Sequence, residues 1–451
     1  MAAASDKLST RFKLLFGTGD LTTNSFQAVI LFYQLYFLTD VAGLRPGLAA
    51  WAIAIGRVWD AFNDPLFGIV SDRIKSPIGR RRVVLLFGAV PLGVSFMLMW
   101  LVPNTSEAYL AAYYTLTFIL FDTCYTAIHV SYNALTPAVT RDYDERSSLN
   151  GYRMVFGLSG SLVAVILATV LGELVADQQT LFRVLGIGLG LLNMVPPLIV
   201  FAISGAYRSQ AASAPLPPWR SISETVKNEA FQMLMGLYLF SWTTASIMAA
   251  VLIYFANYYL DRPDLANYYV LAAQGAAILF IPLVVFMAQK LDKRRTFMVN
   301  CSSWIALLLL LFFVKPEQFG VVFVLAALAG LGIATVYVIP WAMIPDIVED
   351  DEVKTGQRRE GSYYALVSFF QKLGTGAALW MMGQVLEKAG YVTPTAGAAL
   401  PAQPGSAVLA IRLFMSWIPA VLLIVAVWFA SRYPISREKH RALLAELELD
   451  N

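Results

Sequence analysis

Residues 50–82 read AWAIAIGRVWDAFNDPLFGIVSDRIKSPIGRRR. The apolar part of this segment is longer than the roughly 20 residues that a helix needs to cross a bilayer. Asp60, Asn63 and Asp64 nevertheless lie in its middle, and Arg57 precedes Asp60 by three residues. An aspartate at the centre of a membrane helix costs on the order of 3 kcal/mol, so a carboxylate that is kept there usually has a function. We therefore expect a membrane helix that carries a functional site.

The polar residues of this segment suggest a cation site. Their spacings of three and four place Asp60, Asn63 and Asp64 on one helical face. Oxygen ligands suit a small hard cation, so we predict that Asp60 and Asp64 bind Na⁺, with Asn63 and Thr126 as further ligands. A proton on one of two close carboxylates could take the place of the cation. The alternative is a structural ion pair of Asp60 or Asp64 with Arg57 or with another basic residue.

The composition is typical of a multi-pass membrane protein. Of the 451 residues, 58% are hydrophobic and 14% are charged, and the mean hydropathy is +0.62. A soluble domain of this length does not need so much apolar surface. The net charge of +3 is too small to indicate nucleic-acid binding. The two cysteines, Cys124 and Cys301, lie in apolar segments and imply no disulfide framework.

Hydrophobic segments recur along the chain, and the bilayer-length criterion predicts about twelve spans. The longest polar gap contains SAPLPPWRSISE and suggests a linker between two halves. We expect a six-helix half at residues 1–205, a cytoplasmic linker at 206–228, a second six-helix half at 229–432 and a cytoplasmic tail at 433–451. The expected spans are residues 12–40, 50–82, 83–102, 108–137, 151–174, 182–203, 231–260, 267–290, 297–314, 319–344, 361–386 and 407–429.

Lysine and arginine cluster after the even-numbered spans. The positive-inside rule therefore places both termini and the even-numbered loops in the cytoplasm. The basic segment SDRIKSPIGRRR after the second span has a counterpart, AQKLDKRRTF, after the eighth. Asp72 and Asp292 lie near the two charge clusters, at the same place in each half. This internal similarity favours parallel repeats, as in transporters whose substrate site lies between two halves.

Several polar residues in later spans are candidates for a substrate site. Thr126, His129 and Asn133 have the spacing of one helical face, and His129 either binds a polar substrate or packs as a buried histidine. Arg153 either faces a cavity, where it neutralises the second span or binds an anionic group, or extends to the membrane surface. Lys372 lies within the eleventh span and is either a charge partner for the aspartates of the other half or a lysine that reaches water through a cavity without a role.

The segment IPDIVEDDEVKTGQRREG after the tenth span is too polar for the bilayer, so we expect a cytoplasmic loop. Its charges of both signs suggest a latch against the basic loop after the second span. Exposed pairs contribute less than about 1 kcal/mol each, but several that form in one conformation could bias a gate. The alternative is a solvated charge run without a role. The expected gating residues are Asp72, Arg73, Arg80, Arg81, Asp350 and Arg358.

The sequence resembles the glycoside–pentoside–hexuronide:cation symporters, of which melibiose permease is the best-known type. The resemblance covers almost the whole chain and rests on WDAFNDPLFGIVSDR, ALTPAVTRDYDERSSLNGYRM, and PDIVEDDEVKTGQRREG followed by QKLG, in that order. It implies an all-α major-facilitator fold with twelve transmembrane helices in two six-helix halves. By this resemblance the cation site maps onto Asp60, Asn63, Asp64 and Thr126, while Arg153 and Lys372 match a cavity arginine and a lysine of helix eleven.

The sugar site of the family matches less well. Galactoside transporters of the family have aspartates where this chain has Asn24 and His129, and a tryptophan where it has Asn133. The loss of both carboxylates argues against galactoside transport. The segments HVSYNAL and ERSSLNGYRM are also similar to the animal sodium-dependent lysophosphatidylcholine symporters, which keeps an amphipathic lipid substrate open. We assign the substrate site to Asn24, His129, Asn133, Arg153, Tyr337 and Lys372.

These features predict a secondary symporter in a bacterial inner membrane, with Na⁺ or H⁺ as the coupling ion and no cofactor. The expected partners are a small-molecule substrate (a sugar or a lysolipid), a monovalent cation and membrane lipid, and the expected state is a monomer. An enzyme is disfavoured, because the sequence has no His-rich metal motif, nucleophile elbow or phosphate loop. A non-transporting sensor with the same fold remains a further alternative.

Overall fold

The structure is a computed structural model that describes residues 7–74, 76–140, 143–206, 219–357, 359–394 and 400–439. Within these ranges the chain is helical between its turns and connections, and no residue lies in a strand. The chain divides into two compact units, Met1–Ala214 with Thr393–Pro401, and Pro215–Val392 with Ala402–Asn451. The expectation of an all-α protein is therefore confirmed.

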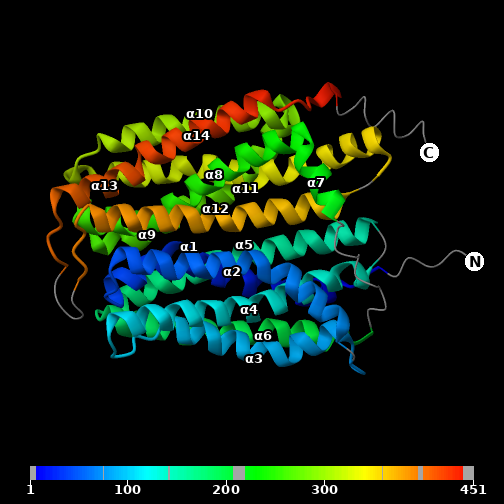
Figure 1. Cartoon of the computed structure of the whole chain (residues 1–451), viewed down its shortest axis with the longest axis horizontal. Helices are drawn as coiled ribbons and strands as arrows, with labels where there is room; N and C mark the ends of the chain where they lie inside the picture. The colour runs from blue at the N-terminus through cyan, green and yellow to red at the C-terminus, as the bar shows by residue number, and fades with distance from the viewer. Residues whose placement is uncertain are drawn as a thin grey trace, which may run out of the picture. The chain divides into compact units, whose positions relative to one another are not determined.

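The described part of the first unit contains six long helices. Figure 1 shows α3 beside α4 and α6, and α1 packs along α5. The closest approach of α1 and α5 needs a glycine, because a Cβ atom on Gly160 would lie 2.6 Å from the carbonyl oxygen of Leu21. The helices are α1 (Thr10–Tyr36), α2 (Pro46–Arg73), α3 (Arg80–Met99), α4 (Glu107–Val139), α5 (Tyr143–Leu174) and α6 (Gln178–Ile203).

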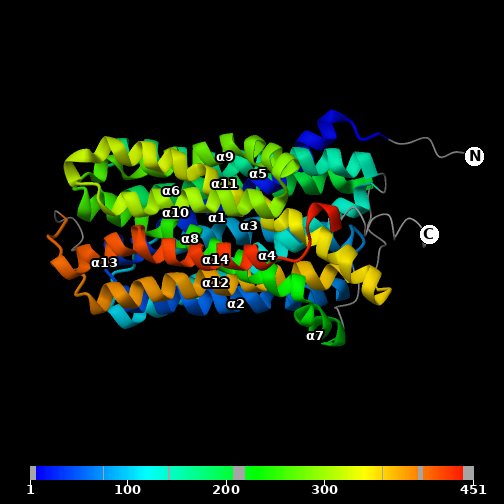
Figure 2. The same ribbon diagram turned by 90° about the horizontal axis from the view of Figure 1, so that it is seen from above.

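The described part of the second unit starts with a short helix and continues with longer ones. Helix α8 packs against α14 and α12, and α9 runs beside α11, as Figure 2 shows from above. The helices are α7 (Trp219–Lys227), α8 (Glu229–Tyr254), α9 (Ala266–Leu291), α10 (Lys293–Phe312), α11 (Phe319–Thr355), α12 (Glu360–Lys388), α13 (Gly405–Met415) and α14 (Trp417–Arg432). The break between α13 and α14 falls at Ser416, which caps both helices.

Eight helical segments of the described chain are long and apolar enough to cross a membrane. Helices α1, α2, α4 and α12 are as long but are not among them. Large apolar side chains such as Phe87, Leu116 and Leu279 are exposed on helix surfaces, where lipid rather than water would cover them. The structure therefore has the character of a multi-pass membrane protein, and the exact number of twelve spans stays a prediction.

Helix α11 differs from its expected length. It was expected to end near residue 344, before an acidic loop, but it continues to Thr355. The acidic residues are tolerated in the helix because basic side chains neutralise them: Asp346 binds Lys293 at 2.7 Å, and Asp350 binds Lys354 at 2.6 Å. The helix ends at Gly356, whose positive φ of 66° is a conformation that glycine adopts without strain.

The first long helix of each unit ends in a π-helical turn. These turns are η1 (Phe37–Val41) after α1 and η3 (Phe255–Tyr259) after α8. The hydrogen bonds that close them have the same spacing of five residues, because the N–H of Ala42 bonds to the carbonyl of Phe37 at 2.8 Å and the N–H of Leu260 bonds to that of Phe255 at 3.0 Å. The sequence similarity between the halves therefore has a counterpart in the backbone.

Candidate functional site

Arg57 and Asp60 form an ion pair inside the first unit. Nη1 of Arg57 donates to Oδ2 of Asp60 at 3.4 Å, and the two side chains are only 7% and 3% exposed. The guanidinium group also lies over the ring of Phe118 on α4, 5.4 Å from its centroid. The structural ion pair with Arg57, which was the alternative to a cation site, is therefore present for Asp60.

Asn63 and Asp64, on the next turn of α2, bind to α4. The amide nitrogen of Asn63 donates to the carboxylate of Asp122 at 3.1 Å. The hydroxyl of Thr126 donates to Oδ1 of Asp64 at 2.9 Å. The structure therefore brings Asp64 and Thr126 together as the sequence predicts, whereas it turns Asp60 toward Arg57 and the nitrogen of Asn63 toward Asp122. The assignment of all four to a cation site stays a prediction.

A second polar cluster joins α1, α4 and α5 around Arg153. Its Nε donates to Oδ2 of Asp20 at 2.6 Å, and its Nη2 donates to Oδ1 of Asp20 at 3.2 Å. Nη1 donates to the hydroxyl of Thr136 at 2.7 Å, and Nη2 also donates to Oδ1 of Asn133 at 2.5 Å. The hydroxyl of Tyr132 lies 3.1 Å from Oδ2 of Asp20 and 2.9 Å from the backbone carbonyl of Phe16, so the two oxygens share its single hydrogen, and the ring of Tyr132 faces the guanidinium group at 4.5 Å. Arg153 therefore does not extend to the membrane surface, and its counter-ion is Asp20.

This cluster fixes the hydrogen-bonding state of His129. Because a guanidinium group only donates, the oxygen of the Asn133 amide must face Arg153, and its nitrogen must face His129. That nitrogen lies 2.9 Å from Nε2 of His129, which must therefore accept the hydrogen bond. This arrangement makes Nε2 of His129 the acceptor of that hydrogen bond, and the ring stacks on Tyr125 with a centroid distance of 5.5 Å.

Asn24 lies one turn after Asp20 on α1. Its amide nitrogen donates to the backbone carbonyl of Asp20 at 2.9 Å. A Cβ atom on Gly157 of α5 would come within 2.8 Å of that nitrogen, so the glycine makes room for the amide. Asn24, which is one of the predicted substrate residues, therefore lies beside the Asp20–Arg153 pair.

In the second unit, Tyr337 belongs to a group of aromatic side chains that carry hydrogen-bonding atoms. Its ring lies 5.0 Å from that of Trp242, whose indole nitrogen donates to the hydroxyl of Thr375 at 3.0 Å. The indole of Trp341 donates to the hydroxyl of Tyr238 at 3.1 Å. Lys372 lies on α12, one turn before Thr375. Such rings offer flat apolar faces with polar edges to a ligand.

The expected gating residues are partly described. Arg81 donates to the backbone carbonyl of Ala134, and Arg80 begins α3. Asp350 is buried between Lys354, at 2.6 Å, and Lys439, at 3.6 Å. The side chains of Asp72 and Arg73 lie outside the described part of the structure, as does Arg358 altogether. The proposed latch stays a prediction.

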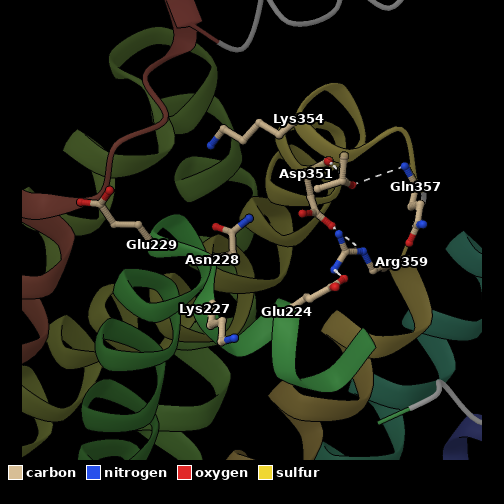
Figure 3. A pocket seen from close by; sticks show the side chains of 9 residues that line it. Glu224, Lys227, Asn228, Glu229, Asp351, Lys354, Gln357 and Arg359 are labelled. Carbon is tan, nitrogen blue, oxygen red and sulfur yellow. Dashed lines mark hydrogen bonds and ion pairs between the residues drawn. The ribbon is translucent and has the colours of Figure 1, made fainter. Parts of the chain in front are cut away.

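A cavity of about 510 Å³ with a charged lining lies in the second unit, where α7 and the start of α8 meet the end of α11 and the residues just before α12. Figure 3 shows Arg359 between two carboxylates. Its Nη1 lies 2.5 Å from Oε2 of Glu224, and its Nε lies 3.3 Å from Oδ2 of Asp351. Lys227, Glu229 and Lys354 line the same cavity, so both signs of charge are present. Arg359 thus ties the short helix α7 to the end of α11.

Asp20, Tyr132, Thr136 and Trp242 were not among the residues that sequence reasoning selected. A signal for Asp20 was present, because it is a carboxylate within the first apolar span of a chain that also has an intramembrane arginine. Nothing in the sequence distinguishes Tyr132, Thr136 or Trp242 from other tyrosines, threonines and tryptophans of membrane helices.

Comparisons with known proteins match almost the whole chain to transporters. The family described as MFS/sugar transport protein matches residues 15–437. The chain is 30% identical to the uncharacterised symporter sll1374 of Synechocystis sp., over 99% of this chain and 98% of the relative. It is 26% identical to the putative glycoside/cation symporter YagG of Escherichia coli, over 98% and 95%. It is 24% identical to the sodium-dependent lysophosphatidylcholine symporter 1 of Gallus gallus, over 97% and 88%.

Solved structures show the same fold. The nucleoside transporter NupG superimposes with a TM-score of 0.62 at 14% identity, over 94% of this chain and 100% of that one. Together with the family match, this confirms the expectation of a major-facilitator fold. The family and its structural neighbours are transporters and not enzymes.

Proposed function

Because this chain belongs to the MFS/sugar transport protein family of cation-coupled symporters, we propose that it couples Na⁺ or H⁺ movement to the uptake of a sugar, glycoside or sugar acid. The substrate would cross by alternating access, with the two halves opening to one side of the membrane at a time. The coupling ion and the substrate class are the parts of this proposal that go beyond family membership.

The observation that carries the proposal is the contact between Asp64 and Thr126. A carboxylate inside a membrane protein, with a hydroxyl oxygen 2.9 Å away on a neighbouring helix, provides ligands of the kind that Na⁺ prefers. Within the described residues, no three His, Cys, Asp or Glu side chains gather as a metal centre would require.

The coupling follows from differential binding. A cation at Asp64 would recruit Thr126 and the amide oxygen of Asn63, and so draw α2 and α4 together. Since α4 also carries His129 and Asn133, occupation of the cation site would favour the conformation that binds substrate. A ligand shifts such an equilibrium only by its difference in affinity between the two states, so ion and substrate must each prefer the same state.

A second candidate is a cation-coupled transporter of lysophospholipid or of another amphipathic lipid. The relative from Gallus gallus, which is named as a lysophosphatidylcholine symporter and matches almost the full chain, supports this candidate. The aromatic group around Trp242 and Tyr337 would suit an acyl chain as well as a sugar ring.

We further propose that the protein lies in a bacterial inner membrane as a monomer, with both termini in the cytoplasm. The distribution of lysine and arginine between the loops supports this orientation.

Counterflow in proteoliposomes tests the function. Vesicles loaded with an unlabelled glycoside or lysophosphatidylcholine should exchange it for labelled external substrate, and an imposed Na⁺ or proton gradient should drive accumulation. Asp64→Asn should abolish accumulation while counterflow persists, because the variant loses coupling and keeps the substrate site. Unimpaired accumulation by Asp60→Asn and Asp64→Asn would show that the coupling residues are wrong.

A further inference from the structure

The Asp20–Arg153 pair has a consequence for the substrates that this site accepts. Arg153 is the candidate cavity arginine, and an arginine in a transport site is an obvious receptor for a carboxylate or phosphate. In this structure its charge already has a carboxylate partner from the protein itself. Asp20 binds Nε and Nη2 at 2.6 and 3.2 Å, which is the two-pronged geometry that an acidic substrate would use.

The remaining donors of Arg153 are also nearly all used. Thr136 and Asn133 accept from Nη1 and Nη2, so four of the five guanidinium N–H groups take part in these hydrogen bonds. The hydroxyl of Tyr132 lies 3.1 Å from Asp20 and shares its hydrogen between this carboxylate and the carbonyl of Phe16. Asp20 and Arg153 therefore each have a hydrogen-bond partner in addition to one another.

The pair is not sealed from ligands. The side chain of Arg153 is 15% exposed and that of Asp20 is 13% exposed, whereas the Arg57–Asp60 pair on α2 is exposed by only 7% and 3%. Asn24, Asn133 and His129, which belong to the candidate substrate site, lie within one or two hydrogen bonds of the pair. A substrate at these residues would meet the pair as a neutral unit.

We propose that Asp20 is a specificity-determining residue, an internal counter-ion that occupies Arg153 and makes this site select uncharged or zwitterionic substrates over anionic ones. The inference rests on the proposed symport function and narrows its substrate class. An anionic substrate that took Arg153 would leave Asp20 as a charge without its counter-ion inside the protein, which is strongly unfavourable. A glycoside or a zwitterionic lysolipid needs no such exchange.

Chemical rescue tests the counter-ion without knowledge of the substrate. Acetate is the aspartate side chain detached from the backbone, so it should bind to Arg153 in the space that Asp20→Ala creates. Acetate should raise the unfolding temperature of purified Asp20→Ala along a saturating curve, and chloride at equal ionic strength should not. The wild-type protein and Asp40→Ala should not respond; Asp40 is a buried aspartate that follows the same helix and accepts from the hydroxyl of Thr39 at 2.5 Å. Equal responses to acetate and chloride, or an equal response of Asp40→Ala, would overturn the proposal.

Matched ligand pairs test the selectivity. Methyl glucoside and methyl glucuronide differ in one carboxylate, and lysophosphatidylcholine and lysophosphatidylglycerol differ in net charge. In thermal-shift titrations of the wild-type protein, the uncharged or zwitterionic member of the pair that binds should have about tenfold or higher affinity. Asp20→Asn keeps the shape of the side chain and should lower or reverse the ratio of the two affinities.

The outcomes separate the two proposals. The selectivity proposal would be refuted if the wild-type protein bound the anionic ligand of a pair more tightly. It would also be refuted if Asp20→Asn lost affinity for both ligands equally. If Asp20→Ala does not fold, the wild-type ranking and the Asp20→Asn ratio still decide it. If acetate stabilises Asp20→Ala but neither the glucosides nor the lysophospholipids bind, Asp20 is the counter-ion of Arg153 and the proposed substrate classes are wrong.

Discussion

Arg57 and Asp60 lie one turn apart on α2 and bind each other at 3.4 Å, with both side chains almost completely buried. Removing one member of a buried pair leaves an uncompensated charge, which typically costs about 3–5 kcal/mol. We therefore expect Arg57→Met to lower the unfolding temperature in detergent markedly. The double variant Arg57→Met/Asp60→Asn should recover most of the loss. A stable Arg57→Met protein would show that Asp60 has another counter-ion.

Thr126→Val tests the cation site with little change of shape. The variant removes the hydroxyl that lies 2.9 Å from Asp64, so the Na⁺ affinity should fall by about tenfold. The measurement is the Na⁺ dependence of uptake or of thermal stability. Thr117→Val on the same helix is the control, because Thr117 bonds only to backbone carbonyls in the hydrogen bonds that we observe, at 2.9 and 3.3 Å. A matching loss in both variants would assign the effect to helix stability.

The tautomer of His129 is open to direct measurement. The chain has two histidines, so His440→Gln leaves His129 as the single imidazole signal. Nitrogen-15 NMR should show a neutral ring with hydrogen on Nδ1 and none on Nε2, because the Asn133 amide donates to Nε2. Asn133→Leu removes that donor, so the other tautomer should become populated. A signal from hydrogen on Nε2 before this change would contradict the orientation of the amide.

Arg359 should control the order of α7. It binds Glu224 on α7 and Asp351 on α11, and its side chain is buried, whereas Glu224 is half exposed. In Arg359→Gln, amide hydrogen exchange over Trp219–Lys227 should become faster, because α7 loses its ionic contact with the rest of its unit. Arg262→Gln removes the exposed Arg262–Asp264 pair and should leave exchange in α7 unchanged. Unchanged exchange in Arg359→Gln would mean that apolar contacts alone hold α7.

The contact between α1 and α5 should depend on Gly160. A Cβ atom there would lie 2.6 Å from the backbone of Leu21, and backbone cannot yield as a side chain can. Gly160→Ala should therefore cost about 1–3 kcal/mol of stability. Gly151→Ala, on the same helix in open space, should be neutral or stabilising by up to about 1 kcal/mol. Equal stability of the two variants would show that the helices separate at little cost.

Hydropathy was sufficient to predict an all-helical membrane protein, because a bilayer requires long apolar helices wherever the chain crosses it. It could not predict the end of α11. The acidic residues after Ile344 suggest a loop in isolation, but Lys293 on another helix neutralises Asp346 and allows the helix to continue. Such a contact joins residues that are far apart in sequence, so local composition does not reveal it.

For the candidate site, the sequence identified several of the residues but not the partners that they contact. The spacing of Asp60, Asn63 and Asp64 identified polar residues of one helix, yet it could not tell that Arg57 would take Asp60 while Thr126 would contact Asp64. The sequence also singled out Arg153 without finding its partner. Two opposite charges in different spans can pair or can serve separate ligands, and only the packing of α1 on α5 decides between these outcomes.

The paired π-helical turns η1 and η3 bear on the ancestry of the chain. A single π-helical turn is rare within an α-helix, whereas at a helix C-terminus it is one way to close the last turn, and both of these turns lie there. Both turns begin at the phenylalanine of a Tyr-Phe pair, since η1 starts at Phe37 after Tyr36 and η3 starts at Phe255 after Tyr254. The first long helix of each unit therefore closes in the same way at the same dipeptide, which is what duplication of a single half would leave in both copies.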